Sequence, residues 1–189
     1  MNNFFIIFYC CLLLTGCLNV AVSGANAVYD RHDLQTAWQE HSIGMRAEQA
    51  IYLDSNQFND THVSVVAFRK KILLVGQTPT ITARKNIEQI VRQIANNPPE
   101  LYNQISIAAP ISSMTQASDS WITAKIKSQF IDANEIDPNQ IKVVTENGTV
   151  YLMGIVSHEM GDIAVDITRN TEGVQNVVRV FSWIYIRRV

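Results

Sequence analysis

The side chains that could carry out catalysis or bind a metal are few, and they are widely scattered. Four histidines, His32, His41, His62 and His158, lie far apart along the chain without the spacing of a metal site. His158-Glu159 begins like the zinc-binding helix motif of metalloproteases, but the second histidine of that motif would fall at position 162, which is Asp162. The sequence contains no glycine-rich phosphate loop, nucleophile elbow or Cys-x-x-Cys pair. We therefore expect no enzymatic activity, no metal site and no cofactor.

The three cysteines, Cys10, Cys11 and Cys17, all lie near the N-terminus. Residues 4–14 form an uncharged apolar run, which is shorter than the roughly 20 residues that span a bilayer and is typical of a signal peptide. Leu14-Thr15-Gly16-Cys17 follows at once and resembles the lipobox of bacterial lipoproteins. The resemblance implies cleavage before Cys17 and acylation of its thiol and new amino group. The alternatives are an ordinary secretory signal with a chance cysteine, or a buried first strand. One departure from the lipoprotein pattern is that residues 1–3 carry no Lys or Arg.

Leu18 follows the acylated position, where an Asp would retain many lipoproteins in the inner membrane. The resemblance therefore implies a lipid anchor at the outer membrane, facing the periplasm. We expect residues 1–16 to be the signal peptide and residues 17–40 to be the acylated N-terminus and a tether.

The composition limits the size of the fold and the class of partner. The chain has 189 residues, of which 47% are hydrophobic and 17% are charged. This is enough apolar material for one ordinary domain or two very small ones. A formal net charge of −2 argues against nucleic acid as a partner, because phosphate binding usually requires a basic excess.

An internal repeat organises the rest of the chain. Residues 63–76 align without gaps on residues 141–154, and both segments predict a strand, a tight turn and a second strand that ends in glycine. In the second copy Asn147-Gly148 favours a type I′ hairpin turn. The first copy has Arg69-Lys70-Lys71 at this place, so we expect a turn of different construction there.

Helical patterns flank each hairpin. In the second copy Ser118-Asp119-Ser120 is a candidate N-cap, and the apolar residues Ile122, Ile126, Phe130 and Ala133 recur at helical spacing. Ile43, Ala47, Ala50 and Ile51 play the corresponding part in the first copy. Further helices are expected over residues 83–95 and 162–170, followed by strands over residues 101–107 and 174–186.

Each copy is thus an α-β-β-α-β unit, and the fold class is α+β with two tandem modules. We expect each module to form a small mixed sheet covered by helices. The first module should span residues 41–108 and the second residues 118–189, joined by a linker over residues 109–117.

The unit resembles the BON domain. The resemblance rests on Leu74-Val75-Gly76 and Leu152-Met153-Gly154 at the hairpin ends and on the closing Gly173-Val174-Gln175-Asn176-Val177 at the start of the last strand. The first module departs from it, because Pro98-Pro99-Glu100-Leu101 stands where a Gly-Val close is expected. Two such modules behind a lipobox resemble the dual-BON outer-membrane lipoproteins of the DolP/YraP type. The resemblance implies binding of anionic phospholipid through the second module, and a role in envelope integrity, including at division sites.

The residues themselves indicate where lipid could touch the second module. At about 100° per residue, Trp121, Lys125 and Ser128 lie some 140° from the buried stripe of their helix, with Ala124 and Ile131 beside them. A large aromatic beside a cation suits the boundary between headgroups and acyl chains. The alternative is that Trp121 packs against the other module or the linker.

Two further groups allow both a functional and a structural interpretation. Arg69, Lys70 and Lys71 could attract anionic headgroups, although a solvated turn is the favoured explanation. The strand over residues 180–186 is apolar on both faces, which favours a central strand with Trp183 in the core.

A second functional hypothesis stays open. The Trp121 face or an exposed strand edge could instead dock a periplasmic envelope or division protein, which would make the chain a protein-interaction adaptor.

Overall fold

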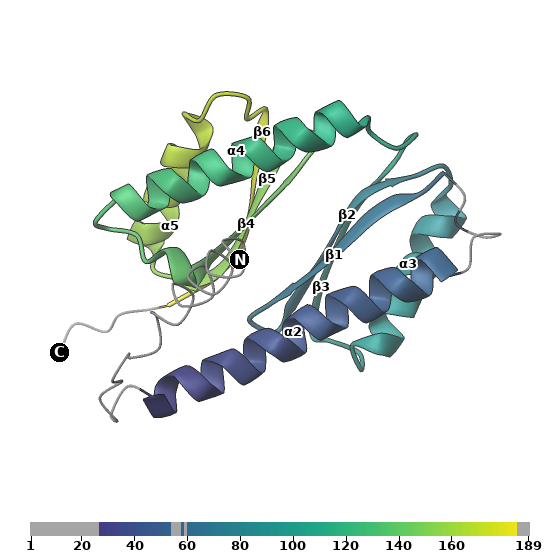
Figure 1. The fold of residues 1–189 in the computed structure, drawn as a ribbon, viewed down its shortest axis with the longest axis horizontal. Helices are drawn as coiled ribbons and strands as arrows, with labels where there is room; N and C mark the ends of the chain where they lie inside the picture. Colours follow the sequence, from purple (N-terminus) through teal and green to yellow (C-terminus); the bar gives the residue numbers. More distant parts are fainter. Residues whose placement is uncertain (1–26, 54–57, 59, 185–189) are drawn as a thin grey trace, which may run out of the picture. The chain divides into compact units, whose positions relative to one another are not determined.

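A computed structural model of the chain describes residues 27–53, 58 and 60–184 (Figure 1). Residues Met1–Thr36 and Ala37–Val189 form two separate units. Both α-β-β-α-β modules lie within the second unit, except that the first helix of the first module begins before Ala37. The expected signal peptide (residues 1–16), Cys17 and the last five residues of the chain lie outside the described residues.

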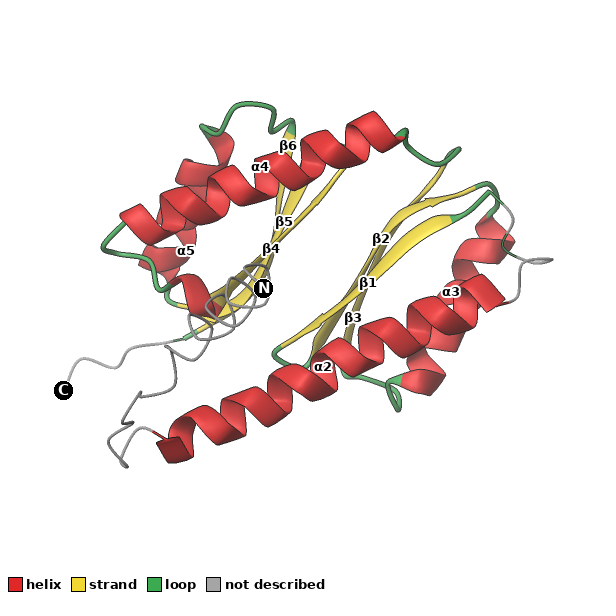
Figure 2. Cartoon of the chain, viewed as in Figure 1, coloured by secondary structure: helices red, strands yellow, loops and turns green. Residues whose placement is uncertain are grey.

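The order of elements confirms the two predicted modules, as Figure 2 shows by secondary structure. The first module comprises α2 (Ala27–Leu53), β1 (His62–Phe68), β2 (Lys71–Thr78), α3 (Ile81–Ile94) and β3 (Glu100–Ile107). The second comprises α4 (Ser113–Asp132), a 3-10 turn η1 (Pro138–Gln140), β4 (Ile141–Glu146), β5 (Thr149–Val156), α5 (His158–Arg169) and β6 (Asn176–Trp183).

Each module holds one three-stranded mixed sheet. The strand orders are β1-β2-β3 and β4-β5-β6, and in each sheet the first pair is antiparallel and the second is parallel. The parallel partner needs a crossover connection, which α3 and α5 provide. The α+β class with two mixed sheets is therefore confirmed.

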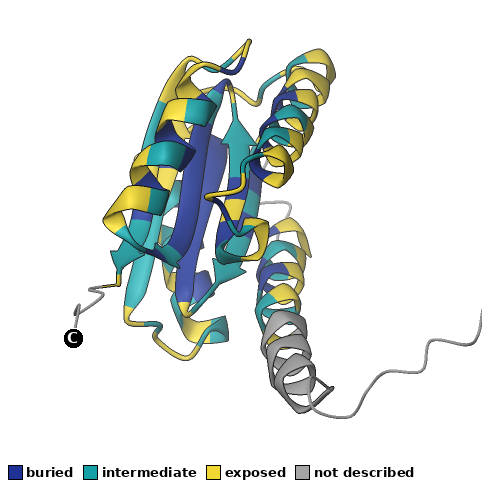
Figure 3. Cartoon of the chain, turned by 90° about the vertical axis from the view of Figure 1, so that its left-hand side faces the viewer, coloured by how far each residue is buried: buried dark blue, intermediate teal, exposed yellow. Residues whose placement is uncertain are grey.

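The central strands β2 and β5 are buried on both faces (Figure 3). Ile72 and Leu74 pack with the helices of the first module, whereas Leu73 and Val75 point the other way and join a third cluster. That third cluster also contains Tyr151, Met153 and Val180 of the second sheet. The two sheets therefore bury their helix-free faces together, which explains why β2 and β5 are almost continuously apolar.

The last strand corrects one prediction. β6 is an edge strand and not the central strand that its apolar sequence indicated. Its two faces are nevertheless both covered, since Val180 joins the third cluster while Phe181 and Trp183 pack against the helical core of the second module. Trp183 also stacks on His158, with ring centroids 4.1 Å apart. Two-sided burial of an edge strand produces the same sequence pattern as a central one.

The two hairpin turns are built alike, contrary to expectation. Asn147 and Gly148 have φ values of 48° and 69°, and Arg69 and Lys70 have φ values of 48° and 65°. The register leaves the same two-residue loop in both hairpins. The strand twist imposes this primed turn geometry even where the residues are not suited to it.

The glycine that ends each hairpin permits close backbone contact. A Cβ on Gly76 would lie 2.0 Å from the carbonyl oxygen of His62, and one on Gly154 would lie 2.4 Å from that of Gln140. The aligned glycines therefore share one structural cause.

All four described helices begin earlier than the sequence indicated: α3 by two residues, α5 by four, and α2 and α4 by more. α2 begins at Ala27, inside the segment expected to be a tether, and α4 begins at Ser113, inside the expected linker. Ser112 is the N-cap of α4, since its side chain accepts a hydrogen bond from the backbone N–H of Thr115. The predicted N-cap at residues 118–120 is therefore wrong.

Candidate functional site

α4 separates a buried side from an outer face. Ile122, Ile126 and Phe130 are buried in the core of the second module, as their spacing predicted. The residues proposed for lipid contact lie on the opposite side, with Lys125 half-buried and the other four exposed; we call this set the α4 outer face: Trp121, Ala124, Lys125, Ser128 and Ile131. Trp121 retains 51% of its surface exposed and Ile131 retains 71%. Trp121 thus lies outside the core, and in the middle of α4 rather than near its start.

Met114 extends this face toward the N-terminus of the helix. It is 84% exposed and precedes Trp121 by two turns, so the two side chains project from the same side of α4. Met114 was not predicted from the sequence, because residues 109–117 were expected to form a linker. The N-cap at Ser112 was the signal that could have revealed it.

Lys125 has two partners at the α4 outer face. Its ammonium group lies 4.5 Å from the centroid of the Trp121 ring, within the range of a cation–π contact. It also donates a hydrogen bond of 3.1 Å to the carboxylate of Glu172, which follows α5 in the sequence. Glu172 was not identified from the sequence, since 47 residues separate it from Lys125.

The three cations at the first hairpin turn are separated by the structure. Lys71 is buried at 1% exposure, pairs with the carboxylate of Glu100 and lies over the ring of Tyr102. The hydrogen bond from Lys71 is the largest of the influences that lower the pKa of Glu100. The expectation that Lys71 could reach a headgroup or belong to a solvated turn is therefore wrong, because it is the first residue of a buried central strand.

The other two cations differ from each other as well. Lys70 is exposed, whereas Arg69 is half-buried with its guanidinium 5.5 Å from the centroid of the Phe68 ring. Lys70 is thus the one cation of the three that the structure leaves open to solvent.

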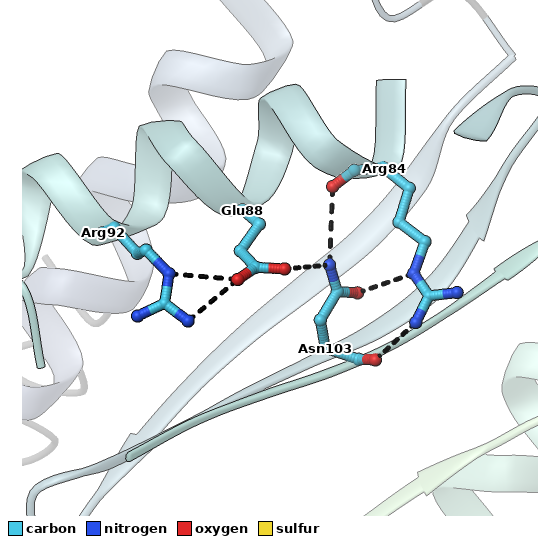
Figure 4. Close-up of polar contacts among 4 residues, drawn as sticks. All are labelled: Arg84, Glu88, Arg92 and Asn103. Carbon is cyan, nitrogen blue, oxygen red and sulfur yellow. Dashed lines mark hydrogen bonds and ion pairs between the residues drawn. The ribbon is translucent and has the colours of Figure 1, made fainter. Parts of the chain in front are cut away.

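A polar network joins α3 to β3 in the first module (Figure 4). The Asn103 side-chain amide donates to Glu88 over 2.9 Å, and Arg92 pairs with the same carboxylate at 2.8 Å. Arg84 in turn donates to the backbone carbonyl of Asn103 over 2.7 Å. The hydrogen bond from Asn103 is the largest of the influences that lower the pKa of Glu88. These groups satisfy one another, so the network fixes the helix on the sheet.

A polar cleft of about 450 Å³ lies within the unit formed by residues 37–189. Three carboxylates contribute to its lining: Glu48, Asp119 and Glu146. Each is engaged in the architecture, since Glu48 accepts from the backbone N–H of Val65, Asp119 from the β4–β5 turn and Glu146 from Gln77. Among the described residues that line the cleft, every carboxylate therefore has a hydrogen-bond partner.

The described residues contain neither a metal-binding cluster nor a membrane-spanning helix. Over residues 27–53, 58 and 60–184, no group of three or more His, Cys, Asp or Glu side chains is arranged to hold a metal ion. Within the same ranges, no helix is long and apolar enough to cross a bilayer.

Known proteins resemble this chain over most of its length. The model of the BON domain matches residues 48–109 and 118–184. The "21 kDa hemolysin" of Actinobacillus pleuropneumoniae is 34% identical over 131 residues, which cover 69% of this chain and 67% of that protein. The "Outer membrane lipoprotein DolP" of Haemophilus influenzae (strain ATCC 51907 / DSM 11121 / KW20 / Rd) is 25% identical over 177 residues, covering 92% of this chain and 91% of that protein.

Among solved structures, the C-terminal domain of CdsD, from the type III secretion system of Chlamydia trachomatis, matches 71% of this chain and 96% of that one. Its sequence identity is 10% and its TM-score is 0.32, values too low to support a conclusion about this chain. The family assignment rests instead on the two matched segments, each of which covers the sheet and crossover helix of one module and part of its first helix. The chain belongs to the BON-domain family and contains two BON domains in tandem.

Proposed function

We propose that the protein is a non-enzymatic lipoprotein of the outer membrane whose second BON domain binds anionic phospholipid through the α4 outer face. Cys17 would hold the chain to the membrane, with the folded modules in the periplasm. The binding would support the integrity of the outer membrane, including at sites of division. The observation that carries this proposal is the exposed Trp121 ring with the Lys125 ammonium against it.

The chemistry of this pair suits the boundary between headgroups and acyl chains. An indole ring has an apolar body and a polar N–H, so it partitions to the interface of a bilayer. A lysine beside it can direct its ammonium toward phosphate while its methylene stem stays in apolar surroundings. Met114 and Ile131 add apolar surface to the same side of α4, and each is more than two-thirds exposed.

The relatives support the location. One is named an outer-membrane lipoprotein and aligns with nearly the whole of this chain, and the other is named a hemolysin. Both names concern membranes. Cys17 lies outside the described residues, so its acylation rests on the lipobox resemblance. Acylation there would present the α4 outer face to lipid at high effective concentration, so the face itself need not bind tightly.

Replacement of Trp121 by Glu tests the proposal. We expect the mature chain from position 17, carrying Cys17→Ser to prevent acylation, to float with vesicles that contain phosphatidylglycerol and less with pure phosphatidylcholine. Trp121→Glu should abolish flotation, because it puts a carboxylate where the ring would enter the interface. Ile81→Glu is the matched control, since Ile81 is 63% exposed on α3 of the other module. Unchanged flotation of Trp121→Glu would refute the assignment of this face.

The protein-interaction adaptor remains the second candidate function. One observation limits the surfaces through which an adaptor could bind a partner. The outward backbone groups of the edge strand β1 are occupied by side chains of α2: Tyr52 bonds to Val63, and Glu48 accepts from the N–H of Val65. A partner strand cannot pair there without displacing them. An adaptor would therefore not use the β1 edge at Val63 and Val65, whereas the exposed Trp121 side of α4 is open to a partner. Flotation that is absent or indifferent to lipid charge would favour the adaptor function.

A further inference from the structure

The position of Glu172 next to the α4 outer face is fixed by its two neighbours in the chain. The Thr171 hydroxyl donates a 2.6 Å hydrogen bond to the Gln129 side chain of α4. On the other side, Gly173 lies so close to α4 that a Cβ there would be 3.0 Å from the Ile122 side chain. The backbone of Glu172 is thus held beside α4 on both sides.

The side chain of Glu172, in contrast, is 81% exposed and contributes little to the packing of the domain. Among the described residues, its one recorded polar contact is the 3.1 Å bond to the Lys125 ammonium. The backbone of Glu172 is fixed by the neighbouring residues, but its carboxylate is exposed to solvent. The carboxylate can therefore leave Lys125 without disturbing the fold. Lys125 is 34% exposed in this pair, so solvent and ligands can reach the ammonium as well.

We propose that Glu172 is an internal counter-ion that competes with anionic lipid headgroups for Lys125. It thereby sets the anionic-lipid content at which the second BON domain binds a membrane. The inference rests on the proposed function of the α4 outer face and adds a regulating residue to it. A headgroup phosphate would have to displace the Glu172 carboxylate before it could pair with the ammonium over the Trp121 ring.

The magnitudes of the two interactions make this competition effective. An exposed ion pair changes an equilibrium by about fivefold or less. The attraction of one lysine to an anionic membrane is of the same order, about fivefold. Because neither partner dominates, the outcome depends on how many anionic headgroups are near, and a membrane with few of them would leave Lys125 paired with Glu172.

The test compares Glu172→Gln with the parent chain, both from position 17 with Cys17→Ser. Flotation is measured on phosphatidylcholine vesicles with a rising share of phosphatidylglycerol. We expect Glu172→Gln to bind about threefold to fivefold more tightly at low phosphatidylglycerol content, and the difference to shrink as that content rises. Glu135→Gln serves as the charge-matched control, because Glu135 is exposed in the same domain and lies outside the α4 outer face.

The same substitution in a Lys125→Gln background separates competition from simple charge. If Glu172 acts through Lys125, Glu172→Gln should give no gain once the lysine is absent. An equal gain in both backgrounds, or an equal gain from Glu135→Gln, would show that the loss of a negative charge suffices and would overturn the inference. No gain from Glu172→Gln while the parent chain still binds would also overturn it. Failure of the parent chain to bind at any phosphatidylglycerol content would instead refute the proposed function.

Discussion

At the scale of single residues, Asp119 joins two distant elements of the second domain. Its side chain is 5% exposed, and its two oxygens accept hydrogen bonds of 2.7 Å and 2.9 Å from the backbone N–H groups of Asn147 and Gly148. It thereby ties α4 to the β4–β5 turn. From the sequence, Asp119 was expected to be part of an N-cap. In the structure its carboxylate instead accepts hydrogen bonds from backbone N–H groups of a distant turn.

We expect Asp119→Ala to lower the free energy of unfolding by roughly 3 kcal/mol, because it leaves two N–H donors without their charged acceptor. Urea denaturation followed by circular dichroism would measure the change. Asp166→Ala, at an exposed carboxylate on α5, is the control and should stay within about 0.5 kcal/mol of the parent chain. A similar loss in both variants would contradict the role given to Asp119.

At the scale of elements, the two hairpin turns adopt the same backbone geometry although their sequences differ. Both turns place two consecutive residues at positive φ, and a carboxylate of the preceding helix accepts from each turn. In the first module that acceptor is Glu40, which lies 3.4 Å from the backbone nitrogen of Lys70. The difference lies in conformational cost, since Asn and Gly tolerate positive φ and long side chains do not.

This difference in conformational cost predicts that Lys70→Gly and Gly148→Lys change the free energy of unfolding in opposite directions. Lys70→Gly should raise the free energy of unfolding by about 1 kcal/mol, because it relieves the left-handed conformation of an exposed lysine. Gly148→Lys should lower it by at least about 1 kcal/mol, because a Cβ there would also lie 2.9 Å from the Gln175 side chain. Thermal unfolding of the two variants would check the signs, and destabilisation by Lys70→Gly would contradict the argument.

At the scale of the whole unit of residues 37–189, the two domains share a buried apolar cluster and a polar contact at its edge. The side-chain amide of Gln77, near the end of β2, donates a 2.6 Å hydrogen bond to Glu146 of β4, and its Oε1 accepts from the backbone N–H of Ile111. Gln77 is 3% exposed. Burial is the largest influence on Glu146 and raises the pKa of its carboxyl, although the bond from Gln77 acts in the opposite sense.

The raised pKa of Glu146 predicts a specific pH dependence. The stability that this group contributes is fully present below the ordinary pKa of a glutamate and is lost as pH rises through the raised folded-state value. Glu146→Gln imitates the protonated form. It should therefore be more stable than the parent chain near neutral pH, and the difference should shrink as pH falls through the raised pKa.

The measurement is a pair of urea titrations at several pH values, in which the difference between the two chains isolates Glu146 from other carboxyls. This subtraction matters, because Glu88, Glu100 and Asp137 have lowered pKa values and their contributions run in the opposite direction. A difference that does not change with pH would show that Glu146 has the same pKa in the folded and unfolded chain.

The sequence by itself determined the repeat, the order of elements and the residues of each helical core. Local periodicity and the glycines at positions 76 and 154 suffice for that, because they report burial within one α-β-β-α-β module. It also indicated that Trp121 lies off the core, since a helical wheel separates its two sides. Tertiary structure alone decided that Lys71 is buried, that Asp119 holds a turn and that Glu172 pairs with Lys125. Each of these interactions joins residues that lie 28 or more positions apart in the sequence. Local periodicity indicates which face of a helix or strand is buried, but it does not indicate which distant residue will contact a given side chain.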